Sequence, residues 1–392
     1  MDYDWVSELR AQFPAAEKTV FLDIAYENAG ALFALEAARE FFSDWNDVSP
    51  SVVKAGGEGK GRIVDVVRRT RQAAAGLLGG VEPGQIAFLK NTNEGINALL
   101  QGFDWQPGDN VVTDSQEHPS VLMPCLNLSR FGVACKVAQP ADGVSVTPEL
   151  LLAHADEHTR FVVVSHVQSA TGYRTDLPRL AAMCRKRGIF LVVDAIQSLG
   201  LIPFDAKAWG VDAVSASCYK GLLGTGGVGL LYASPELLRR VRPVYAAANA
   251  CLGIDRTSWQ LTGLDSPSAS KLENSTMDFS GIYALLAGLE RIHAIGIDQI
   301  AAHISGLFEQ LYRGLEALGF SIVTPFHASE RCHSLSILTD TPQALYCHFQ
   351  QNGIFVSSSG GKYVRLSIAP FNNRQDIGKA LKAASLWPGR NA

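Results

Sequence analysis

Residues 110–217 alternate between short apolar runs and helical patterns. The apolar runs, each ending in polar or small residues, are 110–114, 160–166, 188–195 and 210–217. Such runs are typical of parallel strands buried on both faces. Segment 176–188 has Asp176 as a candidate N-cap, a proline in its first turn and a glycine at its end, which predicts a helix. This alternation predicts an α/β fold with helices on both faces of a sheet.

The pattern changes after about residue 265. Two amphipathic stretches and then two strand candidates follow, at 281–296, 300–319, 334–340 and 363–370. We therefore predict a large α/β domain over 20–265 and a small α+β domain formed by 1–19 with 266–392. The glycine-rich segment 54–61 is either a lid or a linker.

Composition narrows the classes of partner. With 392 residues, 47% of them hydrophobic, the chain can bury a closed site. Its formal charge of −4 comes without blocks of like charge, which argues against nucleic acid and anionic membranes and favours small molecules. The acidic N-terminus and the absence of long apolar runs predict a cytoplasmic protein. Seven cysteines without a CxxC pair argue against a disulfide framework and a metal site.

An aspartate and a lysine end neighbouring strand candidates. Asp194 ends the run FLVVD, and Lys220 follows the run ending in SAS. Ligands of α/β sheets collect at these strand ends. The pair is either a salt bridge at the sheet edge or a pyridoxal phosphate site, in which lysine forms a Schiff base and the buried aspartate keeps the pyridine nitrogen protonated. The two residues alone do not decide between these interpretations.

The glycine run 224–229 formally fits the dinucleotide motif GxGxxG. That motif should follow a strand and open a helix. Here the glycines lead into VGLLYA, which indicates a strand, and the next helix begins only after Ser234, its candidate N-cap. We therefore interpret the glycines as a tight hairpin that brings Lys220 to its cofactor.

The surrounding motifs resemble the class V aminotransferase superfamily of fold-type I pyridoxal phosphate enzymes. Within it, the resemblance is to the branch of cysteine desulfurases, C–S lyases and isopenicillin N epimerase-like enzymes, and it runs through nearly the whole chain. It implies a mostly parallel central sheet flanked by helices, pyridoxal 5′-phosphate as cofactor, and Lys220, His118 and Asp194 as catalytic residues. The opening segment FLDIAYENAG (21–30) lies beside the active site in this family, which implies that Asn28 contacts the substrate.

Two further motifs of the resemblance concern the phosphate and one face of the ring. KNTNEGINALLQGF begins the helix whose N-terminus receives the phosphate, so Thr92 and Asn93 are the matching positions. Free N–H groups and the helix dipole favour an anion there. In SQEHPSVLMP, His118 matches the histidine that stacks on the pyridine ring.

The motifs DAIQSLG and SASCYKGLLGTGG carry the most specific part of the resemblance. Asp194 matches the partner of the pyridinium nitrogen, and Gln197 matches the group that hydrogen-bonds the phenolic oxygen. Lys220 matches the Schiff-base lysine and Ser217 a phosphate contact. Tyr219 stands where desulfurases commonly have a histidine.

Downstream motifs imply a shared site and a substrate clamp. Thr276 matches a threonine that reaches the phosphate of the neighbouring subunit, which implies a homodimer. Arg365 matches the arginine that binds the substrate's α-carboxylate, a task suited to its planar fork. Ser169 replaces a family asparagine close to the ring and is a further candidate for substrate contact.

A departure from the desulfurase pattern narrows the reaction. Desulfurases carry a cysteine shortly before this arginine, whereas here the interval 357–363 reads SSSGGKY, and Cys332 and Cys347 lie well upstream. We therefore expect β- or γ-elimination or replacement through a carbanion at Cα, in the manner of C–S lyases and without an enzyme persulfide. Transamination and epimerisation, including of unusual substrates of secondary metabolism, remain alternatives. A non-catalytic binding protein of the same fold is a third alternative.

Overall fold

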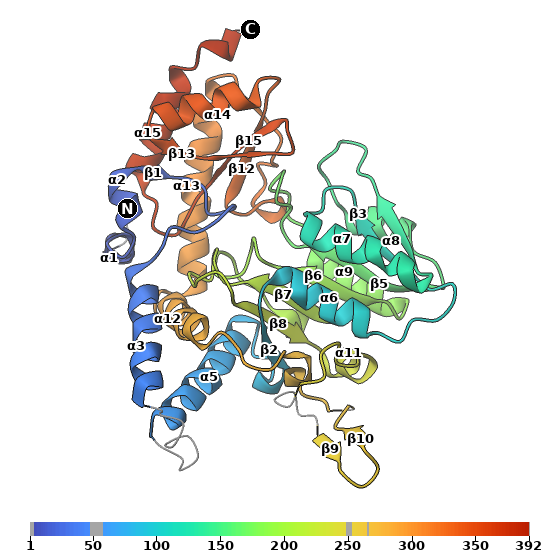
Figure 1. The fold of residues 1–392 in the computed structure, drawn as a ribbon. Coiled ribbons are helices and arrows are strands. Elements are labelled where there is room, and N and C mark those ends of the chain that lie inside the picture. The colour runs from blue at the N-terminus through green and yellow to red at the C-terminus, as the bar shows by residue number, and fades with distance from the viewer. Residues whose placement is uncertain (1–3, 48–57, 248–252, 265, 392) are drawn as a thin grey trace.

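The computed structural model describes residues 4–47, 58–247, 253–264 and 266–391 (Figure 1). Its helices are α1 Asp4–Arg10, α2 Pro14–Lys18, α3 Leu32–Asp47, α5 Glu58–Leu77, α6 Thr92–Gly102, α7 Pro119–Asn127, α8 Pro148–Ala153, α9 Leu177–Lys186, α10 Ala206–Trp209, α11 Pro235–Arg240, α12 Phe279–Ile295, α13 Ile297–Ala317, α14 Pro342–Gln351 and α15 Arg374–Ser385. Its strands are β1 Val20–Phe21, β2 Ile86–Leu89, β3 Asn110–Asp114, β4 Ala134–Ala138, β5 Thr159–Ser165, β6 Phe190–Asp194, β7 Ala213–Ser217, β8 Gly229–Ala233, β9 Gly253–Asp255, β10 Gln260–Thr262, β11 Ser321–Ile322, β12 Ser334–Leu338, β13 Ile354–Phe355, β14 Ser357–Ser359 and β15 Tyr363–Ser367.

A seven-stranded sheet forms the centre of the molecule, in the order β2-β8-β7-β6-β5-β3-β4. Strands β4, β3, β5, β6 and β7 are parallel, while β8 is antiparallel to both of its neighbours. The four apolar runs correspond to β3, β5, β6 and β7, so the predicted fold class is confirmed.

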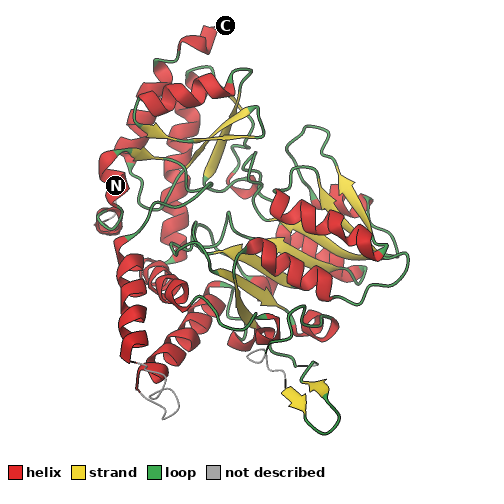
Figure 2. Ribbon diagram, in the orientation of Figure 1, coloured by secondary structure: helices red, strands yellow, loops and turns green. Residues whose placement is uncertain are grey.

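Helices cover both faces of this sheet (Figure 2). Along β5, Phe161 and Val163 belong to the apolar cluster that includes α6 and α7. Val162 and Val164 belong to the cluster that includes α9. Because successive side chains of a strand point to opposite faces, a strand covered on both faces must be apolar throughout. Polar groups can then reach solvent or ligand mainly at the strand ends.

A four-stranded antiparallel sheet, β11-β12-β15-β14, forms the centre of the C-terminal part. The strands predicted at 334–340 and 363–370 are present as β12 and β15. Their apolar side chains, such as Leu335 and Leu366, pack in the cluster that includes α13, α14 and α15. The alternate positions are polar: Ser336 pairs with Arg365, and both side chains hydrogen-bond to the segment that follows β5.

The N-terminal helices lie against the C-terminal part (Figure 1). Arg10 forms an ion pair with Asp376 at 2.7 Å, and Phe13 stacks on Phe371. Strand β1 pairs with β13. These contacts join the ends of the chain, while the proposed division at residues 20 and 265 stays a prediction.

Two glycine-rich segments were singled out in the sequence, at 54–61 and 224–229. Strands β7 and β8 pair as an antiparallel hairpin, but their connection spans 218–228 and is longer than a tight turn. Of segment 54–61, residues 54–57 lie outside the described residues, and Glu58 begins α5. No helix within the described ranges is long and apolar enough to span a bilayer.

Candidate active site

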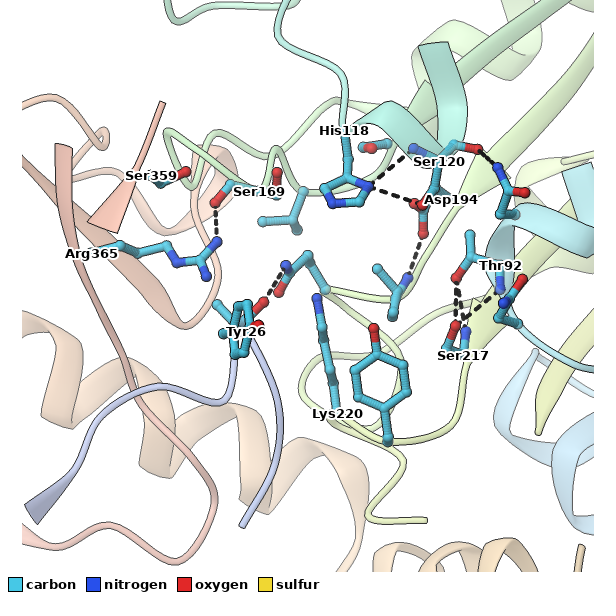
Figure 3. Close-up of a pocket in the computed structure, with 18 of the residues that line it drawn as sticks. Tyr26, Thr92, His118, Ser120, Ser169, Asp194, Ser217, Lys220, Ser359 and Arg365 are labelled. Atoms are coloured by element: carbon cyan, nitrogen blue, oxygen red, sulfur yellow. Dashed lines mark hydrogen bonds between the residues drawn. The ribbon is translucent and has the colours of Figure 1, made fainter. Parts of the chain in front are cut away.

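A cavity of about 360 Å³ lies where the carboxyl ends of the central strands face β14 and β15 (Figure 3). Ten predicted site residues line this cavity: Thr92, Asn93, His118, Ser169, Asp194, Gln197, Ser217, Tyr219, Lys220 and Arg365. In the close-up, Thr92 and Ser217 lie at one end and Arg365 at the other, with His118 and Lys220 between them. The roles of these residues stay predictions, but their convergence is a property of the fold.

Lys220 reaches the middle of the cavity from the segment after β7. It is 8% exposed, and its amine makes no hydrogen bond or ion pair with the described residues. Burial, assisted by the nearby charge of Arg365, lowers the pKa of Lys220 to about 7, although Asp194 and Asp23 oppose the shift. A substantial share of the amine is therefore uncharged near neutral pH, as a nucleophile or proton acceptor requires.

Asp194 lies at the end of β6, where it is 3% exposed. Burial raises its pKa to about 6, while the N–H of Ile196, which donates to Oδ1, and the Lys220 charge oppose the shift. A cationic ring nitrogen against this carboxylate would offset the cost of burying its charge. Gln197 lies at the same strand-to-helix turn; its Nε2 donates to the Ala25 carbonyl, and its Oε1 is buried without a partner among the described residues.

Helix α6 directs its N-terminus at the cavity end that Ser217 also lines. Gly95 lets the helix lie against β7, since a Cβ there would come 2.2 Å from Ser215 Oγ. The Thr92 N–H donates to Ser217 Oγ, and the Ser217 N–H donates to Thr92 Oγ1, both at 2.9 Å. The side-chain amide of Asn93 instead donates from Nδ2 to the Ser120 carbonyl. The hydroxyls of Thr92 and Ser217 thus lie together at a helix N-terminus, where the helix dipole favours an anion.

His118 lies above Lys220 in the close-up, as the N-cap of α7 (Figure 3). Its Nδ1 accepts the Ser120 N–H at 3.1 Å, which fixes the ring. Burial, with the charges of Lys220 and Arg365, lowers the pKa of His118. A neutral ring held in this way is suited to stacking on an aromatic cofactor.

Arg365 is 5% exposed, and its fork is partly held by the protein. Nε donates to Ser357 Oγ at 3.1 Å. Nη1 donates to the Ser169 carbonyl at 2.5 Å (Figure 3). Burial lowers its pKa to about 10, while Asp23 opposes the shift, so it remains a cation at neutral pH. Nη2 makes no hydrogen bond with the described residues and is available to a carboxylate.

Two predicted residues do not line the cavity. The backbone N–H of Asn28 donates to the Tyr219 carbonyl, and its side-chain oxygen is buried without a partner among the described residues. Thr276 is exposed and lines a neighbouring cavity of about 280 Å³. Lys90 and Gly227 line both cavities, so the second adjoins the first.

Sequence reasoning missed several residues near the cavity. Asp23 acts electrostatically on both Lys220 and Arg365, and burial raises its pKa to about 6. Tyr26 and Ser358 line the cavity itself. Ser358 lies in the uninterrupted serine run of β14, which has no alternation of polar and apolar residues to single it out, and nothing local marked Asp23.

These groups fit pyridoxal phosphate: a buried carboxyl for the ring nitrogen, an amide for the phenolic oxygen, a lysine amine for the aldehyde and a helix N-terminus for the phosphate. The fold and site therefore define a fold-type I pyridoxal phosphate enzyme. The family model "Aminotransferase class-V" matches residues 31–386, and the chain belongs to that family.

Similar proteins agree with this assignment. A probable cysteine desulfurase of Methanothermobacter thermautotrophicus is 29% identical over 317 residues, covering 79% of this chain and 76% of that protein. An uncharacterized aminotransferase of Schizosaccharomyces pombe is 24% identical over 95% of this chain and 94% of its own. The cysteine desulfurase of Thermococcus onnurineus superposes with a TM-score of 0.88 at 21% identity, covering 98% of each chain.

A cystine C–S lyase, C-DES, whose structure holds its reaction product cysteine persulfide, superposes with a TM-score of 0.86 at 22% identity. The match covers 96% of this chain and 100% of that one. Another structure of C-DES holds glycine linked to its pyridoxal phosphate. Together with the family match, these findings identify a pyridoxal phosphate-dependent enzyme acting on an amino-acid substrate.

Proposed function

We propose that this enzyme eliminates or replaces a β- or γ-substituent of an amino acid, in the manner of a C–S lyase, and forms no persulfide on its own cysteines. The observation that carries the proposal is the hairpin β14–β15. Ser357 pairs with Arg365 and Ser359 with Tyr363, so residues 360–362 only turn the chain. Gly360 and Gly361 have positive φ in this turn. The hairpin occupies the interval in which desulfurases carry their cysteine.

The described cysteines are poorly suited to accept sulfur from this cavity. Among the described residues, none that lines the cavity is a cysteine. The Cys332 thiol is buried and donates weakly to the Gln197 carbonyl, and burial raises its pKa to about 12. Cys347 is exposed on α14, where its sulfur accepts a hydrogen bond from Gln343. Since the thiolate is the reactive form, Cys332 is a weak nucleophile.

The residues of the cavity have separable tasks in this reaction. When bound, pyridoxal phosphate supplies an electron sink for the charge left at Cα. Arg365 holds the substrate carboxylate and thereby orients the Cα–H bond. Lys220 Nζ accepts the Cα proton, a task that its lowered pKa permits at neutral pH.

Product analysis with L-cystine, the substrate class named for C-DES, tests the proposal. We expect a keto acid, ammonia and a persulfide-bearing product, with no sulfur bound to the enzyme. Cofactor converted to its amine form would instead indicate transamination, and exchange of the Cα hydrogen with change of configuration would indicate epimerisation. Cys332→Ser and Cys347→Ser should each keep turnover within about twofold. A persulfide trapped by alkylation on either thiol would contradict the proposal.

We also propose that the enzyme is a homodimer with shared sites. Thr276 is exposed and lines the second cavity, which shares Lys90 and Gly227 with the first. The family resemblance implies that this threonine contacts the cofactor phosphate bound in the neighbouring subunit. Sedimentation during dilution, with cofactor absorbance as a second readout, should show that dissociation to monomer releases pyridoxal phosphate. Monomers with full cofactor occupancy would contradict the shared site.

A further inference from the structure

Two carboxyl groups, those of Asp114 and Glu117, are buried behind one wall of the active-site cavity. Asp114 ends β3 and is fully buried; Glu117 is 7% exposed. Ser165 donates to both oxygens of Glu117, from its N–H to Oε1 and from its hydroxyl to Oε2, each at 2.5 Å. Gln168 Nε2 donates to Glu117 Oε1 and to Asp114 Oδ2, each at 3.2 Å. One amide nitrogen thus bridges the two carboxyl groups and holds them close together.

Glu117 connects this pair to the part of the cavity that surrounds the cofactor ring. Its neighbour in the chain is His118. Its partner Ser165 lines the cavity and pairs in register with Asp194 on the adjacent strand. A shift of Glu117 would therefore move groups expected on one face and at one edge of the ring.

Gln168 connects the pair to the part of the cavity that surrounds the substrate. It closes a turn, because its N–H donates to the Tyr173 carbonyl and its own carbonyl accepts the Gly172 N–H. The next residue in this turn is Ser169, whose carbonyl accepts the hydrogen bond from Arg365 Nη1. The bridge at Gln168 thus joins the carboxyl pair to the turn that carries the carbonyl holding the arginine fork.

Two carboxylates this close in a buried site cannot both be ionised, because their repulsion and desolvation would be prohibitive. Burial raises the pKa of both groups, that of Asp114 to about 6 and that of Glu117 well above its usual range. Among the described residues, the groups that set these two values include no cation. The remaining ionisable neighbour is the Cys125 thiol of α7, which hydrogen-bonds to Cys135 of β4. The pair therefore holds one proton, which the two carboxyl groups share.

We propose that Asp114 and Glu117 are a positioning pair that holds one proton and locks the His118 and Ser169 walls of the active site together. The inference rests on the proposed function only in assigning His118 to the cofactor and Arg365 to the substrate. It gives a task to an acid pair that does not touch the cavity.

The first test separates the charge of Glu117 from its hydrogen bonds in the cofactor-loaded enzyme. Glu117→Gln imitates the protonated acid, so the dissociation constant of pyridoxal phosphate should stay within about threefold of wild type. Glu117→Ala leaves Ser165 and Gln168 without their acceptor, so this constant should rise about tenfold or more, and the visible circular dichroism of the bound cofactor should change. Wild-type dichroism and affinity in Glu117→Ala would overturn the proposal.

The second test concerns the single proton. Folded enzyme keeps a proton that an unfolded glutamate releases above a pH of about 4.5, so wild-type stability falls as pH rises from there. Glu117→Gln lacks this loss. The melting temperature of this variant minus that of wild type should therefore increase steadily between pH 5 and 8. A difference that is independent of pH would overturn the one-proton assignment.

Asp212→Asn is the matched control. Burial raises the pKa of Asp212 to about 6 as well, but this residue precedes β7 at the opposite end of the sheet, where it accepts the Leu191 N–H. Its variant should show a pH-dependent stability gap together with unchanged cofactor dichroism. A changed dichroism in this control would show that the signal reports general stability, and would overturn the positioning role.

Gln168→Ala keeps the proposal testable even if Glu117→Ala fails to fold. Because this variant loosens the Ser169 carbonyl, binding of L-alanine should weaken several-fold, while binding of ethylamine, which lacks a carboxylate, should not change. Equal effects on both amines, or none, would overturn the link to Arg365. A persulfide on the enzyme would contradict the elimination proposal and leave these readouts unaffected.

Discussion

The two sheets of this protein present their polar groups in different ways. The seven-stranded sheet has helices on both faces, so the polar groups that it presents to the cavity, such as Asp194 and Ser217, lie at strand ends (Figure 2). The four-stranded sheet packs its apolar face on α13, α14 and α15, and its other face carries Ser336 and Arg365. The active site forms where the ends of one sheet meet the face of the other.

This difference separates two kinds of functional group. Groups at strand ends are held by turns and helix starts and are suited to gripping a rigid cofactor. Groups on the polar face of the four-stranded sheet are held by contacts with the segment after β5, as Arg365 is by the Ser169 carbonyl. Substrate binding should therefore depend on how the four-stranded sheet packs against the seven-stranded sheet. Cofactor binding should depend mainly on the seven-stranded sheet.

Lys220→Ala should have the largest effect, since it removes the reactive group beside the large sheet. We expect turnover to fall at least about 10³-fold, because nucleophile and proton acceptor are lost together. Borohydride reduction followed by peptide mass spectrometry should fix the cofactor on Lys220 in wild type. Lys90→Ala, a second lysine of the cavity lining, should keep that label. Labelling of any other lysine would contradict the assignment.

Arg365→Lys should have the next largest effect and should be confined to the substrate. The ammonium keeps the charge but loses the planar fork, so binding of L-alanine should weaken by ~1–3 kcal/mol, or roughly 5- to 150-fold. Absorbance titration of the holoenzyme measures this affinity. Ethylamine provides the control, and an equal loss for that amine would show that the arginine acts on the cofactor region instead.

Asp194→Asn should stabilise the cofactor-free protein at neutral pH. Burial raises the folded pKa of Asp194 to about 6 from 3.8, so the folded state binds more protons between these values and wild-type stability falls as pH rises through them. The variant lacks this loss. Its melting temperature should exceed that of wild type above pH 6, with the gap closing below pH 4. A gap of the same size at all pH values would contradict this expectation.

Two buried serines on the polar face of the four-stranded sheet should give the smallest effects. Ser336 Oγ donates to the Ala170 carbonyl in the segment after β5, whereas Ser334 Oγ has no partner among the described residues. Ser336→Ala should cost ~0.5–1.5 kcal/mol of unfolding free energy in denaturant titrations, and Ser334→Ala less. If Ser334→Ala lowered the unfolding free energy more than Ser336→Ala, hydrogen bonds to the segment after β5 would not explain why this face is polar.

Much of the large sheet could be predicted from local pattern. Apolar runs marked β3, β5, β6 and β7, and the residues just after them converge on the cavity. The positions of Asn28 and Thr276 relative to the cavity could not be predicted, because the motif fixes the type of residue and not the direction of its side chain. Asp23 was missed because its neighbours Lys220 and Arg365 lie far along the chain.

The sequence by itself determined the strand and helix alternation, the helix starts at Asp176 and Ser234, and the lack of a cysteine before Arg365, since each is a local property of consecutive residues. Only the tertiary structure decided which distant groups meet. The bond from Arg365 to Ser169 joins positions 196 residues apart, and the bridge of Gln168 to Asp114 spans 54. Such contacts depend on how the sheets pack, because burial brings polar groups together that no local periodicity relates.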